Sequence, residues 1–134
     1  MSEIVVLDSH VWFWWINLEH QRLSTKMLSE IDRAQRVGVS AVSCYELALA
    51  HYRGRLQLSM PPHEWFPLAL AGSSVELLPL TPEIAIRATE LSQVHRDPFD
   101  RIIIATTLLG NGILLSVDGH FDAYVELEGR LIDQ

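Results

Sequence analysis

Short apolar runs alternate along the chain with longer segments in which apolar residues recur every three or four positions. The runs cover residues 3–7, 39–42, 75–78 and 112–117. Their length and their content of valine, isoleucine and leucine predict four β-strands. Because the apolar residues are consecutive and do not alternate with polar ones, we expect each strand to be covered on both faces, as in a parallel sheet.

The segments between these strands are predicted to be helices. We expect them at residues 9–18, 24–35, 43 onward, about 65–71, 81 onward and 98–109. Ser24 can cap the second helix, and we expect Gly38 to end it. Ser43, with Glu46 three residues later, matches the capping-box pattern at the start of the third helix. Residues 124–132 are predicted to form an edge strand and a tail.

The alternation of strands and helices predicts an α/β fold. We expect a three-layer α/β/α domain with a mainly parallel central sheet and right-handed crossovers. The chain has 134 residues, of which 49% are apolar, so residues 1–134 are expected to form one domain with a real core. If the first three strands extend the sheet one way and the fourth lies on the other side of the first, a ligand crevice forms beside the first strand.

Several acids lie where this crevice would be. Asp8 follows the first strand, and Asp118 follows the strand at residues 112–117. Asp100 lies in the first turn of an otherwise apolar helix, which Asp97 can cap. Since strand ends and the helices that follow them meet at one edge of a parallel sheet, we expect Asp8, Glu46, Asp100 and Asp118 to converge.

Each of these acids also has an ordinary structural use. The alternatives are a helix cap for Asp8, a capping box for Glu46, a tight turn for Asp118, and a salt bridge with Arg96 or Arg101 for Asp100. Their joint placement at one edge favours a functional site over four separate structural roles.

Four converging carboxylates cannot all stay ionised without compensation. A set of ligands made only of oxygen suits Mg²⁺ or Mn²⁺, and zinc or iron is disfavoured without histidine or cysteine in the set. A metal held in this way can orient and deprotonate a water for in-line attack on a phosphodiester. The four acids therefore predict a metal-dependent nuclease.

The composition of the chain bears on its cellular location and on the partners that it can bind. The single cysteine, Cys44, can form neither an internal disulfide nor a thiolate zinc site. A net charge of −7 argues against a generally basic nucleic-acid surface, although metal ions and arginines can still recruit RNA. The sequence begins with a strand and not a secretory signal, and it has no apolar segment long enough to cross a bilayer. We expect a cytoplasmic protein with no membrane contact.

Four motifs, at residues 5–10, 40–46, 95–105 and 114–118, resemble the PIN domain, and more narrowly the VapC-type toxins of toxin–antitoxin pairs. The resemblance covers nearly the whole chain. It implies a Mg²⁺-dependent ribonuclease that is usually a homodimer and is held inactive by a cognate antitoxin at the acidic cleft. Asp8 and Asp100 would be the principal metal ligands, with Glu46 and Asp118 completing the set.

Three other hypotheses remain at this point. A PIN-like module without activity would act only through its antitoxin contact. A receiver or aspartate phosphatase domain also places an acid after its first strand, but it expects a lysine near a later strand end, and the one lysine is Lys26 on a helix. Metal-free cleavage of RNA could use His10, His95 and His120 as acid and base.

Overall fold

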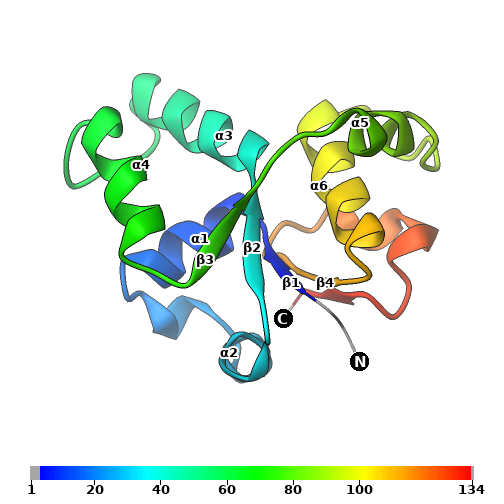
Figure 1. Ribbon diagram of the computed structural model, residues 1–134, viewed down its shortest axis with the longest axis horizontal. Coiled ribbons are helices and arrows are strands. Elements are labelled where there is room, and N and C mark those ends of the chain that lie inside the picture. Colours follow the sequence, from blue (N-terminus) through cyan, green and yellow to red (C-terminus); the bar gives the residue numbers. More distant parts are fainter. Residues whose placement is uncertain (1–3, 134) are drawn as a thin grey trace.

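The computed structural model describes residues 4–133 and contains a five-stranded sheet in the order β3-β2-β1-β4-β5 (Figure 1). All four strand pairings are parallel. The strands are β1 (Val5–Leu7), β2 (Val37–Ser40), β3 (Val75–Leu78), β4 (Ile113–Leu115) and β5 (Leu131–Ile132). The predicted α/β class and the parallel sheet are confirmed.

Six α-helices cover the two faces of the sheet. They are α1 (Ser9–Ile16), α2 (Thr25–Arg33), α3 (Ala41–Tyr52), α4 (Pro62–Ala71), α5 (Pro82–Thr89) and α6 (Pro98–Leu109). In Figure 1, α1, α2 and α4 lie on one side of the sheet, and α5 and α6 lie on the other. Within the described residues, no helix is long and apolar enough to cross a membrane.

Alternate residues of β1 enter two separate cores, and this makes the domain three layers thick. Val5 and Leu7 belong to the core beneath α1, α2 and α4. Ile4 and Val6 belong to the core beneath α6. All three residues of β1 are buried, as expected for a strand that is covered on both faces.

The strand order reverses at β1, as predicted. β1 pairs with β2 on one side and with β4 on the other. The backbone N–H of Asp8 continues the pairing beyond the strand by donating to the carbonyl of Leu115 at 3.0 Å. The segments that leave β1 and β4 therefore begin next to each other, at the edge where ligands bind in such sheets.

The predicted start of the third helix is wrong, because β2 ends at Ser40 and not at residue 42. Ser40 is the N-cap of α3 and accepts a hydrogen bond from the Val42 amide at 3.3 Å, whereas Ser43 is buried inside the helix. The capping box is therefore absent. Glu46 lies in the second turn of α3, so its carboxylate is not used by the helix end.

Two other boundaries differ from prediction. Gly38 does not end the second helix, because α2 stops at Arg33 and Gly38 lies within β2. A Cβ at Gly38 would lie 2.6 Å from Cδ1 of Leu78, so this side chain would have to move to admit a larger residue. Residues 124–132 are mostly a 3₁₀ turn and a loop, and only β5 pairs as the expected edge strand.

We predict that Gly112→Ala will destabilise the fold, because a Cβ there would lie 2.5 Å from the carbonyl oxygen of Ile4. Relieving this overlap requires β1 and β4 to separate, which should cost about 1–3 kcal/mol of unfolding free energy in urea titrations. Gly119→Ala is the matched control, since a Cβ at Gly119 meets nothing within 4 Å. Equal unfolding free energies for the two variants would contradict the close approach of these strands.

Candidate active site

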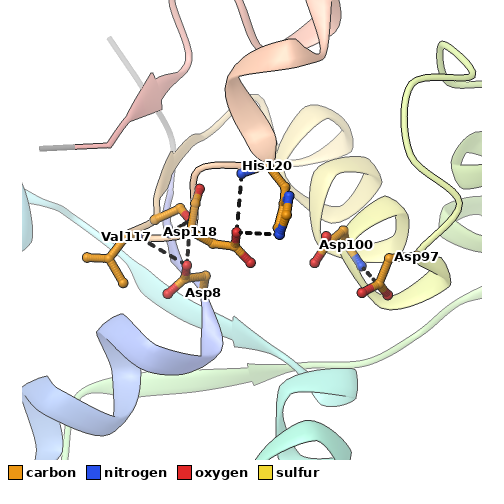
Figure 2. Close-up of polar contacts among 7 residues, drawn as sticks. Asp8, Asp97, Asp100, Val117, Asp118 and His120 are labelled. Atoms are coloured by element: carbon orange, nitrogen blue, oxygen red, sulfur yellow. Dashed lines mark hydrogen bonds and ion pairs between the residues drawn. The ribbon is translucent and has the colours of Figure 1, made fainter.

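Asp8 is fixed in place by donors from two segments of the chain. Its Oδ1 accepts the amide of Val11 at 2.8 Å and so caps α1. Its Oδ2 accepts the hydroxyl of Ser116 at 2.5 Å and the amide of Val117 at 3.3 Å (Figure 2). Asp8 is only 4% exposed, and burial raises the pKa of its carboxyl in spite of these donors. The capping alternative is confirmed, and the cap holds the acid at the edge of the sheet.

Asp100 has no comparable support. Asp97 caps α6 by accepting the amides of Phe99 at 2.9 Å and Asp100 at 3.5 Å, so the Asp100 side chain is not needed for that purpose. The carboxylates of Asp100 and Asp118 point toward each other in Figure 2. The Asp100 carboxylate accepts no hydrogen bond from residues 4–133, and the residue is buried.

The environment of Asp100 strongly opposes its negative charge. Burial contributes most to raising its pKa to about 7, and the neighbouring carboxylates add to the effect. Those carboxylates belong, in order of decreasing effect, to Asp97, Asp118, Glu46 and Asp8. All four predicted site acids therefore interact at one edge of the sheet.

The alternative role for Asp100, a salt bridge with Arg96 or Arg101, is absent from the described part of the chain. Arg101 is buried, and its guanidinium donates to backbone carbonyls of the end of α5 and of the connection to α6. The acceptors are the carbonyl oxygens of Ala88, Leu91, Ser92 and His95. Arg101 thus holds the segment that precedes α6 and does not neutralise Asp100.

Glu46 reaches the site from α3. Its Oε1 accepts the hydroxyl of Ser9, the residue after Asp8, at 2.9 Å. Burial raises the pKa of the Glu46 carboxyl, and the charges of Asp97 and Asp8 raise it further. Since Ser9 is the first residue of α1, this hydrogen bond ties the starts of α1 and α3 together.

Asp118 stabilises a turn and also lies at the candidate site. Its Oδ1 accepts the amide of His120 at 3.2 Å, as the turn alternative predicted, and lies 3.3 Å from Nε2 of His120. Its own amide donates to the hydroxyl of Ser116 at 2.9 Å. Ser116 therefore connects the two acids that end β1 and β4.

Ser9 and Ser116 contact the candidate site acids, and the sequence analysis did not assign them to the site. Each donates its hydroxyl hydrogen to a site acid, Ser9 to Glu46 and Ser116 to Asp8. The sequence signal was a serine one position after Asp8 and another two positions before Asp118. Local spacing shows such a serine but not the acid it meets, because both partners come from other elements.

The side chains as placed do not form a closed metal site. Among the described residues, no three histidine, cysteine, aspartate or glutamate side chains gather closely enough to hold one ion. The donor set still fits Mg²⁺ or Mn²⁺, which commonly bind through one or two carboxylates and complete their shell with water and substrate phosphates. The uncompensated charge at Asp100 adds a physical reason for a cation to bind at this edge.

Comparison with known proteins places the chain in a family. The family model of the PIN domain matches residues 5–127. "Ribonuclease VapC22" of Mycobacterium tuberculosis is 39% identical over 105 residues, which are 78% of each chain. The chain therefore belongs to the PIN-domain family. Within that family it is a VapC-type protein, and the aspartate phosphotransfer hypothesis is set aside.

Solved structures agree with this fold at low sequence identity. VapBC2 from Rickettsia felis, bound to a DNA fragment from its promoter, has a TM-score of 0.69 at 14% identity, covering 96% of this chain and 97% of the other. A toxin–antitoxin complex from Klebsiella pneumoniae has a TM-score of 0.61 at 15% identity, with 96% and 95% covered. At this identity the likeness supports the architecture alone.

We predict that Asp100→Asn will stabilise the metal-free protein above neutral pH. Because the pKa is raised from 3.8 to about 7, the folded protein retains a proton that the unfolded chain loses, and this group's cost to stability grows as pH rises from about 4 to 7. Allowing for solvent screening, we expect a gain of about 1–2 kcal/mol at pH 8 and almost none at pH 4. Urea titrations in chelator at several pH values measure this.

The control for this comparison is Asp32→Asn, which removes an exposed charge on α2. Its effect should stay within about 0.5 kcal/mol at every pH. A pH-independent loss of stability in Asp100→Asn would show that Asp100 has a structural role instead.

Proposed function

We propose that the chain is a single-domain, metal-dependent endoribonuclease that acts as the toxin of a type II toxin–antitoxin pair. The observation that carries the proposal is the crowding of Asp8, Glu46, Asp100 and Asp118 at one edge of the sheet in a VapC-type member of the PIN family. Mg²⁺ is the proposed ion, with Mn²⁺ as a substitute. A cytoplasmic location gives access to RNA.

The residues of the proposed site would have distinct roles. Asp8 and Asp100 would be the principal metal ligands, and Glu46 and Asp118 would complete the set. When bound, the ion would supply positive charge to the scissile phosphodiester and acidify the attacking water. Ser116 and Val117 hold the Asp8 carboxylate in a fixed orientation, so little reorganisation is needed when the ion and substrate arrive.

The proposal extends to two protein partners. The similar structure from Klebsiella pneumoniae is a toxin–antitoxin complex, and those of VapBC2 and FitAB are bound to DNA fragments. By analogy, we propose that this chain forms a homodimer and that a cognate antitoxin covers its acidic edge. A protein that acts only by binding the antitoxin remains the second candidate, but the presence of all four acids, with only carboxylates as the charges that shift the pKa of Asp100, favours catalysis.

We predict that purified protein will cleave RNA with Mg²⁺ or Mn²⁺ and will lose this activity in excess chelator. Asp8→Asn should lower the cleavage rate by ~100-fold or more, because it removes a ligand charge while keeping the α1 cap. Ser116→Ala should lower it by roughly 10- to 100-fold through loss of the hydrogen bond that orients Asp8. Gel assays on labelled RNA measure each rate.

Ser43→Ala is the matched control for Ser116→Ala. Both hydroxyls are fully buried, but that of Ser43 has no hydrogen-bond partner among the described residues and so orients none of the acids. Its cleavage rate should equal that of the parent. Cleavage that continues undiminished in chelator would contradict the metal mechanism and favour the histidines.

We predict that expression of the parent alone will stop growth and that co-expression with the adjacent antitoxin gene will restore it. Asp8→Ala should relieve the toxicity without the antitoxin, because the metal ligand is gone. Growth curves with matched protein levels on immunoblots provide the measurement. Equal toxicity of parent and Asp8→Ala would count against catalysis as the cause.

A further inference from the structure

An aromatic pair borders the acids and has no part in the reaction described above. Tyr45 on α3 and Phe99 on α6 have ring centroids 5.3 Å apart, with their planes inclined at 49°. Tyr45 directly precedes Glu46, and Phe99 directly precedes Asp100. Because consecutive Cα atoms are about 3.8 Å apart, each ring starts within one residue of a proposed metal ligand.

The two rings differ in their surroundings. Phe99 is partly buried and packs against the core beneath α6. Tyr45 is the residue of the pair that faces solvent, and it is 55% exposed. Its hydroxyl forms no hydrogen bond with residues 4–133. Core packing accounts for Phe99 but leaves no structural reason for a large ring at position 45.

The charges at this edge of the sheet do not favour the binding of RNA. Apart from His10, the charges that most strongly affect the pKa values of Glu46 and Asp100 are carboxylates. The nearest arginine in sequence to Asp100, Arg101, is turned into backbone carbonyls. With a net charge of −7, the protein gains from a contact with RNA that adds to the attraction of the metal ion and needs no basic side chain. Stacking of bases on aromatic rings is such a contact.

We propose that Tyr45, supported by Phe99, is a stacking platform for an unpaired nucleobase next to the scissile phosphodiester. The proposal rests on the ribonuclease function proposed above and names a subsite for it. A phosphate at the acids carries its flanking bases with it, one nucleotide to each side, and the exposed ring belongs to the residue next to Glu46. Every base has a π-face, so the platform accepts single-stranded RNA with little preference for sequence.

The test pairs a protein change with an RNA change. The cleavage site of the parent is mapped first, and short single-stranded oligonucleotides are then made with an abasic residue at each position around it. KM and kcat are measured for the parent, Tyr45→Ala, Tyr45→Phe and Tyr52→Ala. Tyr52 is the matched control, because it is a tyrosine of the same helix that is 87% exposed at the opposite end.

We expect Tyr45→Ala to raise KM about 10-fold on intact RNA, in line with the loss of one base stack, with a smaller change in kcat. Tyr45→Phe and Tyr52→Ala should behave as the parent does. One abasic position should raise KM for the parent but not for Tyr45→Ala, because the same contact is already lost. A purely structural role for Tyr45 would penalise intact and abasic RNA equally.

Binding is measured separately by fluorescence anisotropy in an Asp8→Asn background, so that cleavage does not interfere. If the parent cleaves RNA and Tyr45→Ala matches Tyr52→Ala, the stacking subsite is overturned and the ribonuclease proposal stands. If Tyr45→Ala weakens only antitoxin binding, the ring belongs to that interface and the subsite is again overturned. A parent that neither binds nor cleaves RNA overturns both proposals.

Discussion

The hydrogen bond from Ser116 to Asp8 joins residues that are 108 positions apart, and the proposed site depends on it. It can form only because β1 and β4 are parallel neighbours in register, so that the loops leaving them begin side by side. The same loop brings Asp118 toward Asp100, as Figure 2 shows. The strand order therefore sets the geometry of the acids before any metal or substrate is present.

Crowded carboxylates oppose the stability of the fold that positions them. Burial raises the pKa of Asp8, Glu46 and Asp100, and mutual repulsion adds to the effect at Glu46 and Asp100. Arg101 lies close by in sequence but stabilises the preceding loop instead of the acids. Since the charges that shift the pKa of Asp100 are all carboxylates, this edge is suited to bind a cation from solution, which would relieve their repulsion.

Features set by local sequence were predictable, and those set by tertiary pairing were not. The sequence analysis identified both the strand before Asp8 and the helix that starts at Asp97 and Pro98, because neighbouring residues determine a strand end and a helix cap. The start of α3 was misplaced because Ser40 and Ser43 can both cap a helix, and only the register of β2 with β1 decides between them. The acceptors of Arg101 were likewise not predicted, because the backbone conformation of the segment between α5 and α6 brings their carbonyls together.

The observed position of the α3 cap, which differs from the predicted one, also affects the candidate site. If Ser43 had been the N-cap of α3, the Glu46 carboxylate would have accepted a hydrogen bond from the backbone N–H of Ser43, as in a capping box. Starting the helix at Ser40 moves Glu46 into the second turn, where Ser9 holds its carboxylate beside Asp8. Tyr45, the residue before Glu46, then lies on the exposed surface of α3 and against Phe99. One strand register thus determines both where a proposed metal ligand points and where an aromatic ring is available to the substrate.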